Sequence, residues 1–252
     1  MSLEKTAAFI VIGNEILSGR TKDQNINYLT TSLTEVGINV KEVIIIEDDQ
    51  QQIIYHINRL KVMYDYLFTS GGIGPTHDDI TAEAIAKALN KNLILDREAV
   101  KILKEHYKGQ ELNDARLKMA RIPEGSTLLN NPVSSAPGFK IENIFVFAGV
   151  PVIMQAMLRA SMEHLQPGAK KYSRTVNIFL TESIIAEEIS KIQDKYSEVE
   201  IGSYPYIKNN KLGTAIVFRC INRELIDLAL NDYVKFIESN YKNIAELDLN
   251  LI

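Results

Sequence analysis

The sequence lacks the features of disulfide-stabilised and membrane-spanning proteins. Cys220 is the single cysteine among 252 residues, so no disulfide can form within the chain and no cysteine-rich zinc site can be built. Because Cys220 lies in an apolar run, we expect a buried hydrophobic residue there. The longest apolar stretch, residues 144–154, is interrupted by Gly149 and Pro151 and is too short to cross a bilayer. The N-terminal segment lacks the apolar core of a signal peptide, so we predict a cytoplasmic protein without a membrane partner.

A surplus of positive charge is also absent. The chain has 28 Lys and Arg residues against 32 Asp and Glu residues, which gives a formal net charge of −4. Proteins that bind duplex nucleic acid usually present a broad basic surface, so we expect no nucleic-acid partner. Apolar residues make up 46% of the chain and charged residues 24%, which is typical of globular domains. The length suits one large domain or two modest ones.

Strand-like and helix-like patterns alternate three times in the first third of the chain. Apolar runs rich in β-branched residues predict buried strands at 7–12, 40–46 and 66–69. Apolar residues at helical spacing predict a helix after each strand, and Asp23 and Gly37 mark the two ends of the first one. Such alternation is typical of a parallel sheet with helices on both faces. The predicted fold is therefore a three-layer α/β/α domain with a mostly parallel sheet.

The rest of the chain is predicted to finish this domain and to add a second one. A helical pattern covers residues 97–120, and the loop-rich segment after it contains a strand at 144–147 and leads to a helix at 152–165. Beyond a linker, the patterns predict a β-α-β-β-α unit. We place the domains at 1–168 and 172–252, and we interpret the second, a small α+β domain, as a dimerisation or packing module.

The most informative segment runs from Thr69 to Thr81 with the sequence TSGGIGPTHDDIT. Three glycines after a strand let the backbone approach a ligand closely, and the start of the following helix offers a positive dipole end to phosphate. The segment is neither a P-loop nor a dinucleotide fingerprint, because the Gly-Lys-Ser/Thr ending and the glycine spacing are missing. It contains no Lys or Arg, so a bound phosphate would need backbone amides and a divalent cation held by Asp78 or Asp79.

Polar loops follow all three predicted strands, where ligands bind in parallel sheets. Beside the glycine-rich segment these loops are Gly13-Asn14-Glu15 and Glu47-Asp48-Asp49, so Asp48 is a third candidate carboxylate. Structural alternatives remain open for several of these residues. Asp79 could cap the next helix, Asp48 could belong to a turn, and residues 13–15 could be a plain strand-to-helix connection. His77 is expected to be a solvated loop residue, because no second histidine lies at metal-ligand spacing.

Together these segments resemble the molybdopterin-binding domain of the CinA (competence/damage-inducible protein A) family. The resemblance covers the chain up to about residue 165, and the run Gly-Gly-Xaa-Gly-Pro-Thr-Xaa-Asp-Asp-Xaa-Thr carries it most specifically. Weaker matches follow in the family order: Ile12–Gly19, Asp23-Gln24-Asn25, Asp48, Ala136–Phe139 and Gly149-Val150-Pro151. Ser134-Ser135 stands where relatives often have Gly-Thr, and Ala148 stands where many have Pro.

The resemblance implies a domain that binds molybdopterin or a nucleotide at the strand ends, with metal-dependent pyrophosphatase activity on ADP-ribose-type or flavin dinucleotides. It implies Mg²⁺, Mn²⁺ or Co²⁺ as the metal, with Asp48, Asp78 and Asp79 as metal-binding and catalytic residues. We also expect a homo-oligomer, a dimer or a trimer. The residues expected to contact the ligand are Gly13, Asn14, Glu15, Asn25, Ser70, Gly71, Gly72, Gly74, Thr76, Thr81, Ser134, Ser135, Ala136, Pro137 and Gly138.

Three functions remain open at this point. The first is a metal-dependent hydrolase of a pyrophosphate bond, which the pair Asp78-Asp79 favours because anion binding alone has little use for two carboxylates. The second is a binding protein without chemistry, and the third is adenylyl transfer to molybdopterin. Full-length CinA proteins also carry a C-terminal nicotinamide-nucleotide deamidase domain, which we do not expect in this sequence. The small second domain resembles the K-homology-like middle domain of that family, without the Gly-Xaa-Xaa-Gly loop that contacts RNA.

Overall fold

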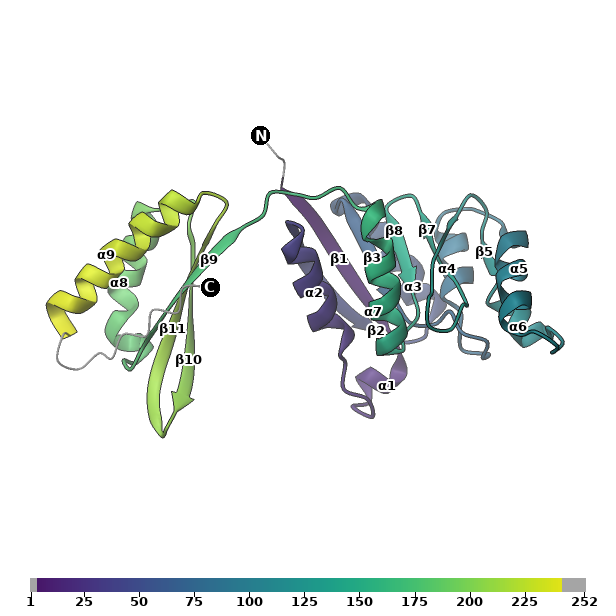
Figure 1. Cartoon of the computed structure of the whole chain (residues 1–252), viewed down its shortest axis with the longest axis horizontal. Helices are drawn as coiled ribbons and strands as arrows, with labels where there is room; N and C mark the ends of the chain where they lie inside the picture. The colour runs from purple at the N-terminus through teal and green to yellow at the C-terminus, as the bar shows by residue number, and fades with distance from the viewer. Residues whose placement is uncertain (1–3, 242–252) are drawn as a thin grey trace. The chain divides into compact units, whose positions relative to one another are not determined.

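The computed structural model of the chain describes residues 4–241 (Figure 1). The chain divides into two compact units that meet between Ala169 and Lys170. Within the described residues, no helix is both long and apolar enough to span a membrane.

The first unit is built on a six-stranded sheet in the order β2-β1-β3-β8-β7-β6. The four strands β2, β1, β3 and β8 run parallel to one another, whereas β7 is antiparallel to β8 and β6 is antiparallel to β7. Their bounds are β1 Lys5–Ile12, β2 Ile38–Ile46, β3 Tyr66–Ser70, β6 Thr127–Leu129, β7 Gly138–Ile141 and β8 Ile144–Phe147.

Helices cover both faces of this sheet, as predicted for a three-layer α/β/α fold (Figure 1). Strand β1 is buried on both sides: Ile10 packs in the cluster with Ile53 and Ile57, and Phe9 packs in the other with Leu29. Continuous apolar runs are typical of strands with two buried faces. The helices on one face are α2 (Asn25–Glu35) and α7 (Pro151–Ser161), and those on the other are α3 (Gln50–Met63) and α4 (Thr81–Ala88).

Two expectations about local structure were wrong. The helix expected over 97–120 is two helices, α5 (Arg97–His106) and α6 (Asp114–Lys118). Gly109 between them has φ +78°, and the Asn113 side chain caps α6, so the backbone leaves the helical region in this segment. The loop expected after the first strand contains a single helical turn, α1 (Asn14–Leu17).

A pair of short strands was not predicted from the sequence. Strands β4 (Leu93–Leu95) and β5 (Arg121–Pro123) pair antiparallel beside α4. A strand of three residues shows no apolar periodicity, so the pattern could not reveal them.

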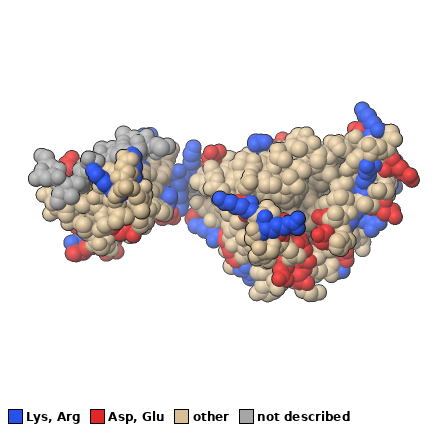
Figure 2. Space-filling view, turned by 90° about the horizontal axis from the view of Figure 1, so that it is seen from below, with Lys and Arg blue, Asp and Glu red and all other residues tan. Residues whose placement is uncertain are grey.

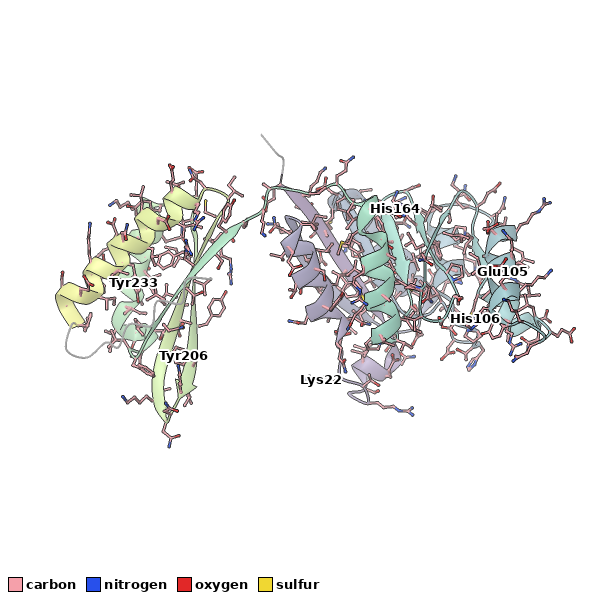
Figure 3. The ribbon with its side chains drawn as sticks, viewed as in Figure 1. Lys22, Glu105, His106, His164, Tyr206 and Tyr233 are labelled. Atoms are coloured by element: carbon pink, nitrogen blue, oxygen red, sulfur yellow. The ribbon has the colours of Figure 1, made fainter. Side chains whose placement is uncertain are left out.

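The second unit has the predicted order β-α-β-β-α, with an antiparallel sheet in the order β10-β11-β9. Asn209 and Asn210 both have positive φ in the turn between β10 and β11, the geometry of a tight hairpin. The helices pack on this sheet around Phe218 and Tyr233, and Figure 3 labels Tyr233 on α9. Cys220 is buried as expected. The bounds are β9 Tyr172–Ile178, α8 Glu182–Lys195, β10 Glu200–Lys208, β11 Lys211–Cys220 and α9 Arg223–Tyr241.

Candidate functional site

A cavity of about 520 Å³ opens where the loops after β1, β2, β3 and β8 converge. Figure 2 views the larger unit from the side on which these strands end and shows acidic and basic side chains close together there. The volume lies within the range of small-molecule sites, about 300–1,000 Å³. The lining includes most of the predicted contact residues: Gly13, Glu15, Asn25, Asp48, Gly71, Gly72, Gly74, Asp78, Asp79, Ser134 and Ala136.

The backbone of Gly71 and Gly72 forms one edge of this cavity in a conformation that requires glycine. Gly71 has φ +107°, and a Cβ atom there would lie 2.1 Å from the carbonyl oxygen of Ile12. Gly72 has φ +68°, and its Cβ atom would lie 2.2 Å from Oγ1 of Thr81. Thr81 holds the loop, since its hydroxyl donates to Gly71 O (2.9 Å) and its N–H to Gly72 O (3.0 Å). The loop is therefore fixed before any ligand binds.

Asp79 shapes the loop rather than the helix that follows. Its Oδ2 accepts hydrogen bonds from the N–H (2.7 Å) and the hydroxyl (2.5 Å) of Thr76. Helix α4 begins at Thr81 with Ile80 as its N-cap, and no side chain caps it. The capping role considered for Asp79 is therefore wrong, because its carboxylate closes the preceding turn instead.

The other two candidate carboxylates have different surroundings. Oδ2 of Asp48 accepts the N–H of Asn14 (3.0 Å), which joins the loops after β1 and β2. Asp78 is exposed, and its pKa lies below the ordinary value, chiefly because of the neighbouring Thr76 hydroxyl and its own backbone N–H, and then because of the charges of His77 and Lys118. Asp78 is therefore ionised at neutral pH.

These three carboxylates line one cavity without forming a ready metal cage. Within residues 4–241, no group of three or more His, Cys, Asp or Glu side chains is close enough to hold a metal ion. Carboxylate oxygens nevertheless suit a hard cation, and Mg²⁺ is commonly held by one or two carboxylates together with substrate phosphates. The donor set therefore fits a divalent cation that arrives with a phosphorylated ligand.

Asn25 lines the cavity and ties two parts of its wall together. The side chain is 3% exposed, and its amide nitrogen donates to Gly149 O (2.8 Å) and to Oγ of Ser70 (3.3 Å). These bonds fix the orientation of the amide, because a carbonyl oxygen can only accept. Oδ1 of Asn25 has no hydrogen-bond partner among the described residues. A buried acceptor without a partner is costly, so this oxygen is a local weakness of the wall.

The loop before β7 forms another part of the wall and is organised by Asn131. The Asn131 side chain is buried, donates to Oγ of Ser134 and to Ala136 O (2.7 Å each), and accepts the N–H of Ser134 (3.1 Å). Ser135 donates its N–H to Asn131 O and has φ +60°. Asn131 lines the cavity but was not predicted as a site residue. Its position before a proline and two serines indicates a loop, not this network.

Some predicted contact residues support the wall instead of lining it. Ser70, Thr76 and Thr81 make the hydrogen bonds described above, and none of them lines the cavity. Pro137 lines a neighbouring cavity, and Gly138 is packed so closely that a Cβ atom would lie 2.3 Å from Val146 O. Asn14 and Ser135 contribute backbone groups: Asn14 N–H binds Asp48, and Ser135 shapes the loop.

Two lysines near the glycine loop were not predicted. Lys22 lines the cavity from the segment between α1 and α2 (Figure 3). Lys118 of α6 donates from Nζ to the carbonyl oxygen of Thr76, although 42 positions separate the two residues. The predicted charge balance of the loop therefore needs correction, because Lys118 from a distant segment contacts the loop and Lys22 lines the same cavity. No local motif contains these lysines, so only the fold brings them together.

Comparison with protein families agrees with this architecture. Residues 8–167 match the model of the probable molybdopterin binding domain, and residues 170–243 match the middle domain of FAD synthase. A protein of Archaeoglobus fulgidus is 36% identical over 196 residues, which cover 78% of this chain and 84% of the relative. A CinA-like protein of Kosmotoga olearia is 32% identical over 231 residues, which cover 88% of this chain and 56% of the relative.

Among solved structures, the crystal structure of CinA from Thermoplasma acidophilum, described as a protein of unknown function, is similar with a TM-score of 0.61 and 35% identity. The match covers 64% of this chain and 97% of that one. The family model spans more than half of the sequence and coincides with the unit that contains the glycine loop and the cavity. The chain belongs to the probable molybdopterin-binding-domain family and is a CinA-like member of it.

Proposed function

We infer that the cavity binds a phosphorylated nucleotide or pterin and that the protein hydrolyses its pyrophosphate bond with the help of a divalent cation. The observation that supports this most is the convergence of Asp48, Asp78 and Asp79 with the backbone of Gly71–Gly74 around one cavity of about 520 Å³. Such a site offers oxygen ligands to a cation beside a backbone that admits close approach of phosphate.

The chain's own groups supply binding and orientation. Gly72 and Gly74 carry no side chains, so phosphate oxygens can approach the loop backbone. Asn25 lines the same cavity and holds Ser70 and Gly149 in its wall through its amide nitrogen. Lys22 adds a positive charge to the same lining. These groups would fix the phosphates of the ligand.

The carboxylates would hold the cation. Asp78 is exposed and, like any aspartate with a pKa at or below the ordinary 3.8, ionised at neutral pH, and Asp48 is positioned through the N–H of Asn14. A cation bound there would neutralise phosphate charge and lower the pKa of an attacking water. Asp79 binds Thr76 and therefore contributes by keeping the loop in shape.

A second candidate is a protein that binds the same ligand, such as molybdopterin, without chemistry. The engagement of Asp79 with Thr76 and of Asp48 with Asn14 favours this alternative, because two of the three candidate carboxylates hold loops in shape. Both candidates need the same cavity, so binding alone does not separate them.

The deciding experiment measures hydrolysis of ADP-ribose and FAD with and without Mg²⁺, Mn²⁺ or Co²⁺. The variants are Asp78→Asn and, as a matched control, Glu47→Gln, an exposed acid outside the cavity lining. We expect turnover that depends on the metal, falls by about 100-fold or more in Asp78→Asn and is unchanged in Glu47→Gln. Absence of turnover with every metal, together with tight binding of a nucleotide or pterin, would leave the binding protein.

A further inference from the structure

The sheet of the second unit has one face that its helices do not cover. Helices α8 and α9 both pack on the face that presents Val176, Ile216 and Phe218 (Figure 1). Successive side chains of a strand point to opposite faces, so the residues between these belong to the other face, which we call the open face. Its central residues are Thr175, Asn177, Phe179, Tyr204, Tyr206, Ala215, Val217 and Arg219.

Three aromatic rings lie on the open face. Tyr204 and Tyr206 are two positions apart on β10, which places them about 7 Å from each other along the strand. A Cβ atom at Gly202 would lie 2.9 Å from the ring of Tyr204, and one at Gly213 would lie 2.5 Å from the ring of Tyr206. Each ring therefore leans over the sheet above a glycine. Phe179 meets the ring of Tyr206 edge to face, with centroids 5.9 Å apart.

The two tyrosine rings are held in place by contacts across the strands. The hydroxyl of Tyr206, labelled on β10 in Figure 3, donates to Ile178 O (3.4 Å). Nη1 of Arg219 donates to Oη of Tyr204 (3.2 Å). Tyr204 is nevertheless 47% exposed. A fixed but exposed ring is suited to stacking with a flat ligand, because little conformational freedom is lost on binding.

The charge of the open face is mainly positive. Alternation along the strands assigns to it the cations Lys171, Lys208, Lys211 and Arg219. Of the Asp and Glu residues among 170–241, Glu200 alone lies in one of the three strands, and it pairs with Lys171 (2.5 Å). Nζ of Lys211 lies 5.5 Å from the ring centroid of Phe179, so cations and rings are neighbours. The open face thus has a local surplus of cations, although the whole chain has a formal charge of −4.

We propose that the open face binds single-stranded nucleic acid, with neighbouring bases stacked on Tyr204 and Tyr206 and the backbone phosphates beside Arg219 and Lys211. Aromatic rings next to cations suit a ligand that has both flat rings and repeated negative charges. The bases of a duplex are stacked on one another and cannot reach such rings, so the open face selects single strands. The charge of the whole chain argues against a broad surface for duplexes, whereas a single strand held by stacking needs only a local patch. This site lies in the second unit and is independent of the function proposed for the first.

The test measures binding of the full chain to labelled oligonucleotides of about twelve nucleotides by fluorescence anisotropy. The probes are oligouridine RNA, oligothymidine DNA and an RNA duplex of the same length. We expect at least one single strand to bind about tenfold more tightly than the duplex, with an affinity that falls as the salt concentration rises.

Variants at Tyr204 separate stacking from other contacts. Tyr204→Ala should lower the affinity for the single strand about tenfold or more, while Tyr204→Phe keeps the ring and should keep the affinity. The matched control is Tyr172→Ala, because Tyr172 is 46% exposed but lies on the other face of the same sheet. This control should bind like the wild-type protein. Thermal unfolding shows that each variant is folded.

The ionic part of the site is tested with Arg219→Gln, which should lower the slope of log affinity against log salt by about 1. Lys191→Gln, on the exposed side of α8, should leave the slope unchanged.

Three results would overturn the proposal: no binding of either single strand, equal binding of the duplex, or the same loss of affinity in Tyr172→Ala as in Tyr204→Ala. Light scattering after size-exclusion chromatography tests the rival occupant, a second copy of this chain. If Tyr204→Ala converts a dimer into a monomer and the wild-type protein binds no oligonucleotide, the open face is an interface between copies and the proposal is wrong.

Discussion

The hydroxyl of Thr81 donates a hydrogen bond of 2.9 Å to the carbonyl oxygen of Gly71, and both groups are buried. The first residue of α4 thereby fixes the backbone that leaves β3. The glycine loop gains its shape from this contact, and several consequences can be measured.

Loss of the Thr81 hydroxyl should destabilise the protein. Thr81→Val keeps the size of the side chain but leaves Gly71 O without this donor, which costs about 1–3 kcal/mol of unfolding free energy. Thr81→Ser keeps the hydroxyl, so its unfolding free energy should fall less than that of Thr81→Val. Urea unfolding followed by circular dichroism measures both. Equal stability of the valine and serine variants would show that the hydrogen bond contributes little.

Gly72→Ala should lower the free energy of unfolding more than Gly109→Ala, although both glycines have positive φ. Gly72 and Gly109 have φ +68° and +78°, but a Cβ atom at Gly72 meets Thr81 at 2.2 Å, while at Gly109 nothing lies within 4 Å. Gly109→Ala therefore measures the backbone cost alone, about 1–2 kcal/mol. We expect Gly72→Ala to lose clearly more unfolding free energy and to weaken ligand binding. If the two variants are equally stable, the steric argument is wrong.

In the second unit, Tyr233→Phe should be neutral or stabilising. The hydroxyl of Tyr233 is buried without a partner among the described residues, and burial raises its pKa. Removing an unsatisfied hydroxyl recovers up to about 1 kcal/mol. The matched control is Tyr196→Phe, whose hydroxyl donates to Asp232 at 2.8 Å and whose loss should destabilise the fold. Thermal unfolding of the two variants tests the contrast, and a large loss in Tyr233→Phe would reveal a hidden partner.

The pair Glu42–Arg59 should make stability depend on pH in the acid range. The bidentate contact with Arg59 (2.5 and 3.1 Å) is the main cause that lowers the pKa of Glu42 below its ordinary 4.5. A group with a depressed folded pKa stabilises the fold fully above its unfolded pKa, and this contribution is lost as pH falls through the folded pKa.

The stability difference between wild-type protein and Glu42→Gln should therefore be largest at neutral pH and should shrink as the pH falls below about 4.5. Urea unfolding at a series of pH values, repeated on the Arg59→Gln background, gives the coupling between the two groups. A difference that does not change with pH would contradict the assignment.

The sequence predicted the parts of the fold that have clear periodicity. Phe9 and Ile10 lie in an unbroken apolar run, and Leu29 and Leu33 lie at helical spacing, so the strand and helix that contain them were recognised. The glycine loop was recognised because Gly71 and Gly72 follow a strand directly. Their neighbour Thr81 was predicted as a ligand contact, whereas the structure shows a buried hydrogen bond to the loop.

What the sequence did not reveal depends on long-range contacts. Lys118 and Thr76 are far apart in the chain, and neither belongs to a motif that requires the other. Short strands such as Leu93–Leu95 contain too few residues for a periodic signal, and they become visible only through their pairing with Arg121–Pro123. The cavity beside the glycine loop that Pro137 and Lys118 line is made mainly of such contacts, so it could not be predicted from patterns.

At the edge of the large sheet the chain reverses direction twice, and these reversals decide where the loop after β6 lies. Strand β7 is antiparallel to β8, and β6 is antiparallel to β7, so β6 again points in the direction of β8. The loop after β6, which contains Asn131, is thereby delivered to the rim on which the parallel strands end. It is tied mainly to itself, through Ser134 and Ala136. Substitutions in this loop should therefore change one wall of the cavity without disturbing the buried strands at the centre of the sheet.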